Sequence, residues 1–405
     1  MRFPGFEGEW ERRKFDEIFI FSTGKNIKQN EASPEFEIPC VRYGELYHMY
    51  DEVINEVVNK TNLDKSELLF SQGDEILLPS AGEDPLDIGS ASALTIENVA
   101  IGRTINILKP LKPNIYSHIY VAYYINHKLK KDISKLAKGV SISNVYNSVL
   151  KTLKINLPSL SEQKIIADLL SLIDFRIEKS IKIIEGLKSF KNAVSKKIFS
   201  QELRFKDENG GDFPDWEMKK LGEICKEHLL KNNMNLHNEV FSVAKHKGVI
   251  NQIEHLGRSF SAKEISHYKL IFHGELVYTK SPTSDFPFGI IKQNRTNRTG
   301  VVSPLYCVFR PNAFALGYLL HEYFNSSINT YNYLNPLVQK GAKNTMNINN
   351  NDFLNGAPLF IPTDEREQTK IADFLSGIEK KIELETALLQ QLKLQKQYFL
   401  RQMFI

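Results

Sequence analysis

Cysteine and long apolar runs are scarce in this 405-residue chain. The three cysteines, Cys40, Cys225 and Cys307, are widely separated and odd in number, which argues against a disulfide framework or a zinc cluster and suits a reducing compartment. No apolar run approaches the ~20 residues of a membrane-spanning helix, and no N-terminal signal peptide is recognisable. We therefore expect a folded cytoplasmic protein that does not enter a membrane.

Catalytic signatures are also scarce. No phosphate-binding GxxxxGK[ST] motif occurs, so this chain is not expected to hydrolyse ATP. The stretch from Pro214 to Lys219 contains the residue types of a metal-dependent nuclease site, but they are contiguous, whereas such carboxylates normally converge on Mg²⁺ from separate places. Asn335-Pro336 lacks the second proline and the aromatic residue of an amino-methyltransferase loop. We expect no catalytic residue, no cofactor and no metal on this chain.

A charge excess of one sign is missing as well. The chain has 52 Lys and Arg residues against 48 Asp and Glu residues, which leaves a net charge of +4. This balance neither predicts nor excludes nucleic acid as a partner. If nucleic acid binds, local basic patches must bind it.

One long amphipathic stretch, from Leu157 to Ser200, organises the sequence. Its apolar residues recur in heptads and no proline follows Pro158, which predicts a single long helix with an apolar stripe. Ser161 is positioned to cap its first turn. The heptad residues are Ile166, Leu170, Ile173, Ile177, Ile184, Leu187, Val194 and Ile198.

The same stretch recurs 205 residues later, at the C-terminal end. The matching segments are Glu162-Gln163 and Glu367-Gln368, and Ile166-Ala167-Asp168 and Ile371-Ala372-Asp373. Upstream, Gly8-Glu9-Trp10-Glu11 matches Pro214-Asp215-Trp216-Glu217, at a distance of 206 residues. Between these anchors the two halves diverge. A long internal repeat determines the architecture, and here it predicts a globular domain and a long helix, each occurring twice.

We place the first globular domain at residues 1–157, the first long helix at 158–204, a linker and the second globular domain at 205–361, and the second long helix at 362–405. Short apolar runs bounded by turn residues, such as Ile76 to Leu78 and Leu276 to Tyr278, predict that both domains are β-rich. Each domain is also expected to hold one helix, over 119–138 and 316–325. The expected fold class is α+β, with two pseudo-twofold-related β-rich domains joined by two long antiparallel helices.

Polar loops with Lys, Arg, Asn, Ser and Thr are the candidate recognition surfaces, because these residue types bind phosphates and base edges. Two of the loops follow Gly139 and Gly341, at matching places ~20 residues before each long helix. The candidate DNA-contacting residues are Lys138, Ser141, Ser143, Asn144, Lys280, Arg295, Arg298, Lys343, Asn344 and Thr345. Taken singly, such a loop is more often an ordinary solvated loop, and the matching places of the Gly139 and Gly341 loops are what favour recognition.

The doubled helix opening resembles the specificity subunit of type I restriction-modification systems. That family has two variable domains, each followed by a helix that opens with a proline and EQxxIA. The motif stands here at Pro158 with Glu162 to Ala167, and at Pro362 with Glu367 to Ala372. The second copy has one extra residue between the proline and the glutamate.

The resemblance implies that each globular domain is a target recognition domain, which reads one half of a split, asymmetric site in double-stranded DNA. It implies that the antiparallel helices act as a ruler and bind two methyltransferase subunits. S-adenosylmethionine would belong to those subunits, and ATP-driven translocation and cleavage, with ATP and Mg²⁺, to two restriction subunits. A pseudo-twofold protein with divergent domains suits a site whose halves differ.

Two other classes remain open on the residues alone. A coiled-coil adaptor or structural protein would also have two long helices, but the loops of its globular domains would be solvated and would show no sequence-specific DNA binding. A stand-alone nuclease or methyltransferase would need the motifs that are missing. A gel shift with random duplex DNA at low and high salt would test the adaptor alternative.

The helix seam is interrupted twice in each copy, at Ser180 and Lys191 and at Glu385 and Lys396, and these interruptions match across the repeat. Because polar seam residues commonly fix register, we favour the antiparallel register that sets Lys191 against Glu385 and Ser180 against Lys396. Its apolar layers pair Ile173 with Met403, Ile177 with Phe399, Ile184 with Leu392, Leu187 with Leu389, Val194 with Ile382, and Ile198 with Ile378. A register slipped by one heptad would give fuller overlap and place Lys191 against Ile378.

Overall fold

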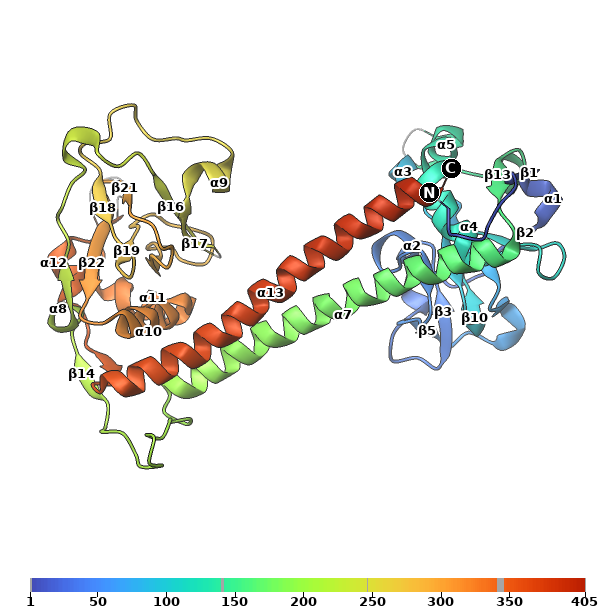
Figure 1. Ribbon diagram of the computed structural model, residues 1–405. Coiled ribbons are helices and arrows are strands. Elements are labelled where there is room, and N and C mark those ends of the chain that lie inside the picture. Colours follow the sequence, from blue (N-terminus) through green and yellow to red (C-terminus); the bar gives the residue numbers. More distant parts are fainter. Residues whose placement is uncertain (1, 140–141, 246, 341–345, 405) are drawn as a thin grey trace. The chain divides into compact units, whose positions relative to one another are not determined.

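The computed structural model describes residues 2–139, 142–245, 247–340 and 346–404 (Figure 1). The chain divides into two compact units, Met1–Lys182 with Thr386–Ile405, and Ile183–Glu385. Each unit therefore combines one globular domain with part of both long helices. Within the described residues, no helix is long and apolar enough to cross a membrane.

The two predicted long helices are α7, Leu160–Phe199, and α13, Glu365–Met403, each drawn as one continuous ribbon in Figure 1. The start of α7 differs slightly from the prediction. The backbone N–H of Glu162 donates to Ser159 Oγ at 3.3 Å, so Ser159 rather than Ser161 caps the first turn, because the helix already begins at Leu160. At α13, the N–H of Arg366 donates to Asp364 Oδ1 at 2.8 Å.

The first domain is built on a five-stranded sheet of order β2-β11-β7-β9-β4, next to a four-stranded sheet of order β5-β3-β10-β6. A two-stranded ladder of β1 and β13 and a short β8–β12 pair complete it. The strands are β1 Glu11–Lys14, β2 Phe19–Thr23, β3 Ile38–Val41, β4 Val53–Ile54, β5 Lys60–Thr61, β6 Phe70–Gln72, β7 Glu75–Pro79, β8 Ala81–Gly82, β9 Ser92–Leu94, β10 Glu97–Ile101, β11 Ile105–Pro110, β12 Ser143–Asn144 and β13 Lys154–Leu157.

The helix predicted over 119–138 is interrupted. It consists of α4, His118–Tyr124, a π-helical turn at Ile125–Leu129, and α5, Lys130–Leu136. The short helices of this domain are α1 Phe15–Ile18, α2 Glu45–His48, α3 Pro85–Ile88 and α6 Asn147–Leu150. The aromatic and apolar face of α4 packs into the main core together with Phe15, Leu108 and Ile155.

The second domain has a four-stranded sheet of order β15-β22-β19-β20, a ladder of β14 and β25, and three further two-stranded antiparallel pairs, β16–β17, β18–β21 and β23–β24. The strands are β14 Glu217–Lys219, β15 Cys225–Glu227, β16 Phe241–Ala244, β17 Gly248–Asn251, β18 Lys269–Ile271, β19 Leu276–Tyr278, β20 Ile291–Gln293, β21 Gly300–Val302, β22 Cys307–Pro311, β23 Gln339–Lys340, β24 Met346–Asn347 and β25 Leu359–Ile361. The helices are α8 Leu221–Ile224, α9 Gln252–Leu256, α10 Phe314–Asn325, α11 Ser327–Leu334 and α12 Asn350–Leu354.

The two domains share a topology that is not apparent from their sequences. In both, the strand after the repeated Trp anchor pairs antiparallel with the strand that leads into the long helix, β1 with β13 and β14 with β25. The main-sheet order β2-β11-β7-β9 of the first domain corresponds to β15-β22-β19-β20 of the second. The α+β fold class, with a long helix between β-rich domains, is confirmed.

The residues assigned to the helix seam are buried or half-buried. On α7, the side chains of Ile173, Ile184, Val194 and Ile198 are buried and those of Ile177 and Leu187 are half-buried. On α13, Ile378, Leu392 and Met403 are buried, and Ile382, Leu389 and Phe399 are half-buried. Within each unit the start of one long helix packs against the end of the other, which makes them antiparallel.

The favoured register is wrong. In the second unit Lys191 Nζ lies 3.4 Å from Oε2 of Glu379, the neighbour of Ile378, which the slipped register sets against Lys191. In the first unit Lys396 Nζ lies 2.8 Å from Asp174 Oδ1, next to Ile173, which the slipped register sets against Lys396.

The apolar contacts agree with the slipped register. Met403 shares a core cluster with Ile166 and Leu170 but not with Ile173, and Val194 and Ile198 share one with Leu375 and Ile371, their partners in the slipped register. The slipped register is tolerated because both lysines pair with carboxylates that lie beside the seam. Polar matching inside the seam is therefore unnecessary, and apolar overlap decides.

Candidate functional site

The glutamate of each EQxxIA motif is a buried anchor. Glu162 is fully buried and its carboxylate accepts hydrogen bonds from Arg2 Nε at 2.9 Å and Nη2 at 2.6 Å. Glu367 is buried in the same way and accepts from Arg204 Nη2 at 3.3 Å. Each arginine lies before its domain and each glutamate after it, so the ion pair closes the two ends of the domain.

These arginines also explain the upstream half of the repeat. Arg2 Nη1 donates to the carbonyl of Gly8, and Arg204 Nη2 donates to the carbonyl of Pro214 at 2.7 Å. Gly8 and Pro214 are matching positions two residues before Trp10 and Trp216. The tryptophans pack edge-on against Tyr120 and Phe199, respectively. The repeated sequence anchors therefore form a repeated structural frame.

The glutamine of the motif satisfies backbone groups. Gln163 Nε2 donates to the carbonyl of Pro158 at 2.9 Å, and its Oε1 accepts from the N–H of Ser117 at 2.9 Å. Gln368 Nε2 likewise donates to the carbonyl of Pro362 at 2.9 Å. The extra residue in the second copy is thus accommodated without loss of this bond.

A half-buried polar cluster connects the first domain to both long helices. We define the first ion-pair cluster as Glu52, Tyr123, Asp174 and Lys396. Lys396 Nζ lies 2.8 Å from Asp174 Oδ1 and 3.0 Å from Glu52 Oε2, and the Tyr123 hydroxyl donates to Asp174 Oδ2 at 2.6 Å. Burial raises the pKa of Asp174 despite the charge of Lys396. Although burial alone would lower it, the two carboxylates raise the pKa of Lys396.

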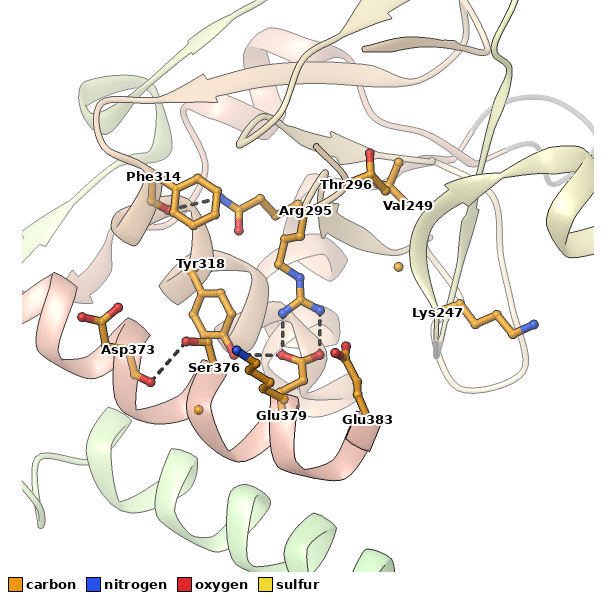
Figure 2. A pocket seen from close by; sticks show the side chains of 14 residues that line it. Lys247, Val249, Arg295, Thr296, Phe314, Tyr318, Asp373, Ser376, Glu379 and Glu383 are labelled. Atoms are coloured by element: carbon orange, nitrogen blue, oxygen red, sulfur yellow. Dashed lines mark hydrogen bonds and ion pairs between the residues drawn. The ribbon is translucent and has the colours of Figure 1, made fainter. Parts of the chain in front are cut away.

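A corresponding second ion-pair cluster contains Lys191, Arg295, Tyr318, Glu322 and Glu379. Lys191 Nζ lies 2.8 Å from Glu322 Oε1, and the Tyr318 hydroxyl donates to Glu379 Oε2 at 3.0 Å. Figure 2 shows the guanidinium of Arg295 facing the carboxylate of Glu379, joined by two hydrogen bonds. Although burial alone would raise it, Arg295 and Lys191 lower the pKa of Glu379 to about 2.

The loop after Gly139 is closed at its base by backbone bonds between Lys138 and Asn144. Gly139 has φ +143°, and a Cβ there would lie 1.9 Å from the Ile142 carbonyl oxygen, so glycine is required. Lys138 is exposed and Asn144 half-buried. Ser143, by contrast, is buried in the pairing of β12 with β8. Its assignment as a surface contact is wrong, because the strand turns its side chain inward.

In the second domain, Lys340 pairs with Met346 in the antiparallel β23–β24 ladder, much as Lys138 bridges to Asn144 in the first domain. Among the candidate residues, Lys343, Asn344, Thr345 and, in the first domain, Ser141 lie outside the described residues.

The other candidate DNA-contacting residues of the second domain, Lys280, Arg298 and Arg295, lie in three different environments. Lys280 follows β19, is half-buried, and has a pKa lowered by burial. Arg298 is held by Glu254 at 2.8 Å and Glu239 at 2.9 Å on the domain surface. The assignment of Arg295 as a free DNA contact is corrected: its guanidinium is occupied by Glu379 and lies over the ring of Tyr318.

A basic cleft in the second unit was missed by the sequence analysis. Its volume is about 1000 Å³, and it lies between the C-terminal part of α7 and the α10–α11 turn. Lys188 and Lys196 line it from α7, Lys245 from the β16–β17 loop, and Lys292 from β20. Burial lowers the pKa of Lys292 to about 8. The sequence indicated this cleft only weakly, because its lysines are spread over about a hundred residues of the chain.

Comparisons with known proteins give similarity to the same family as the helix-opening motif. A family model described as the type I restriction modification DNA specificity domain matches residues 7–189. The putative type I restriction enzyme MjaX specificity subunit of Methanocaldococcus jannaschii is 29% identical over 233 residues, which cover 53% of this chain and 52% of that protein. The MjaVIII specificity subunit of the same organism is 31% identical over 186 residues, covering 44% of this chain and 40% of that protein. The chain thus spans about half the length of the curated relatives it matches.

A solved structure shares the fold along the whole chain. The crystal structure of a type I restriction-modification system S subunit from M. genitalium superposes with a TM-score of 0.65, covering 99% of this chain and 97% of that chain at 15% identity. The resemblance inferred from the two helix openings is therefore shown: residues 7–189 match the type I restriction modification DNA specificity domain, and the chain is similar to type I specificity subunits.

Proposed function

We propose that this chain is the DNA-recognition subunit of a type I restriction-modification complex. Each globular domain is a target recognition domain that reads one half of a split, asymmetric site in double-stranded DNA. The observation that carries the proposal is the combination of a repeated frame with unmatched surfaces. The same buried Arg–Glu and Gln–Pro contacts anchor both domains, whereas the loops they support share almost no sequence.

The reading surfaces include the matching loops closed at Lys138 and at Lys340, together with Lys280 and the basic cleft. Lys138 and Lys280 would contact phosphates, and Asn144 has the donor and acceptor groups that read base edges. Lys188 and Lys196 on α7 extend the positive surface of the second unit. Local patches of this kind suit a chain whose net charge is only +4.

The exposed faces of α7 and α13 are the proposed docking sites for two methyltransferase subunits. Large apolar side chains on these faces, such as Leu172 and Leu394, are more than half exposed, which suits a protein partner. S-adenosylmethionine and the adenine chemistry would belong to those subunits, and ATP and Mg²⁺ to restriction subunits. This chain alone would bind no cofactor and have no turnover.

The test is methylation of a random-sequence plasmid library by the chain assembled with its methyltransferase subunits. We expect methylated adenines in one bipartite motif with two different halves and a fixed spacer. The purified chain alone should transfer no methyl groups. Methylation without a bipartite motif, or turnover by the chain alone, would contradict the proposal; binding of random duplex with no sequence preference would favour the adaptor alternative.

A further inference from the structure

Both ion-pair clusters contain a lysine, a tyrosine and two carboxylates, and the second also contains Arg295. Only some of these residues are equivalent. Asp174 matches Glu379 and Lys191 matches Lys396 in the 205-residue repeat. The domain carboxylates do not match: Glu52 lies in the segment before β4, whereas Glu322 lies on α10. The divergent domains have therefore each supplied an acid to the same lysine position from unrelated elements. Such convergence indicates a requirement at that position.

In both clusters the lysine comes from the helix of the other repeat. The first domain runs into α7, yet its cluster receives Lys396 from α13. The second domain runs into α13, yet its cluster receives Lys191 from α7. Each cluster thus joins one globular domain and both long helices through a single ammonium group, and it forms only when the two helices are in register.

The clusters restrict the position of each domain on the helices, because their charged groups are largely shielded from water and their hydrogen bonds are directional. The side chain of Lys191 is 13% exposed and that of Glu322 is 5% exposed, while Lys396, Glu52 and Asp174 are less than a quarter exposed. A buried charge that loses its partner is strongly unfavourable, and charge-assisted hydrogen bonds tolerate little displacement. An apolar seam alone is less restrictive, since a heptad slip again places apolar residues together.

We propose that Lys396 and Lys191 are positioning residues: they fix the orientation of each recognition domain on the helix pair, and so the spacing between the half-sites that the subunit accepts. This inference rests on the proposed function. It assigns to the two clusters a role in spacer selectivity, separate from the loops that read bases.

The experiment compares the assembled complex carrying Lys396→Met with wild type and with Lys393→Met, an exposed lysine on the same helix. The readout is the distribution of spacer lengths among methylated sites in a random-sequence duplex library. We expect discrimination against a spacer changed by one base pair to fall by about tenfold in Lys396→Met, equivalent to ~1.4 kcal/mol. The bases of both half-sites should stay unchanged, and Lys393→Met should behave as wild type.

A purely structural contribution would lower methylation at all sites without widening the spacer distribution, and that result would overturn the proposal. The triple variant Glu52→Gln, Asp174→Asn and Lys396→Met removes the lysine together with both carboxylates that pair with it, so that a loss of folding caused by an unpaired charge is avoided. It should show the same relaxed spacing, and methylation absent from both variants would also reject the positioning role. If wild type itself gave no bipartite motif, the proposed function would fail instead.

Discussion

At the residue scale, the recurring EQ pair acts through buried bonds rather than through exposed chemistry. Glu162 and Glu367 hold arginines that precede their domains, and Gln163 and Gln368 hold the carbonyl of the proline at each helix opening. The two glutamines differ in one respect. Gln163 Oε1 accepts from the N–H of Ser117, whereas Gln368 Oε1 has no hydrogen-bond partner within the described part of the chain.

This difference predicts unequal stability losses. Gln163→Leu leaves the carbonyl of Pro158 and the N–H of Ser117 without partners, so it should lower the free energy of unfolding by about 2–4 kcal/mol. Gln368→Leu leaves only the carbonyl of Pro362 without its partner and should lower the free energy of unfolding by about 1–2 kcal/mol. Urea unfolding of the two variants and wild type measures both values. Equal losses would show that the Ser117 bond contributes nothing.

Glu379 predicts a specific pH dependence. Its pKa in the folded chain is about 2, against an ordinary value of 4.5. Because the folded pKa is depressed, its contribution is fully present above pH ~4.5 and is lost as the pH falls toward 2. The difference corresponds to about 3 kcal/mol at neutral pH. The stability difference between wild type and Glu379→Gln should narrow between pH 4.5 and 2 in urea unfolding; a constant difference over that interval would contradict the assignment.

At the element scale, sequence periodicity determines where the apolar stripe of each long helix lies, whereas tertiary contacts determine the partners of its polar residues. The heptads place the apolar stripe, but the carboxylates that pair with Lys191 and Lys396 lie beside the seam and on the globular domains. Periodicity along one helix contains no information about those partners. The register was therefore predicted wrongly although the seam residues are buried or half-buried.

Gly186 in α7 provides a prediction for the helix itself. A Cβ at this position would have no heavy atom within 4 Å, and glycine in a helix interior is less favourable than alanine by about 1 kcal/mol. Gly186→Ala should therefore stabilise the chain by about 0.5–1 kcal/mol, measured by denaturant unfolding. Gly139→Ala is the contrasting variant: its Cβ would lie 1.9 Å from a carbonyl oxygen, and it should destabilise the loop. A loss of stability in Gly186→Ala would contradict the first expectation.

At the scale of the whole molecule, two domains of common topology and different surfaces are carried on one repeated frame. The frame explains how the chain can diverge almost completely between its anchors and still fold twice in the same way. Strand order, the closing ladder and the buried Arg–Glu contact are shared. The proposed reading loops are attached to this frame, so that a change in one loop leaves the other domain intact.

This independence predicts the effect of single lysines on binding. Lys138→Gln should weaken binding of the assembled complex through the first half-site, and Lys280→Gln through the second. Each should reduce the slope of log affinity against log salt by about 1, if each lysine neutralises one phosphate. Binding titrations at several salt concentrations, with Lys393→Gln as the control, measure the slopes. Unchanged slopes would remove these lysines from the interface.

The sequence by itself determined the features that repeat or alternate. Two anchors 205 residues apart established the doubled domain-and-helix plan, heptads established the helices, and short apolar runs located strands such as β7 and β19. These features are local or self-matching, so they are visible without coordinates. Only the tertiary structure decided that Ser143 faces inward, that Arg295 is occupied by Glu379, and that the lysines of the seam pair outside it. The physical reason is that a side chain's partner is set by contacts between segments far apart in the chain, which composition and periodicity do not encode.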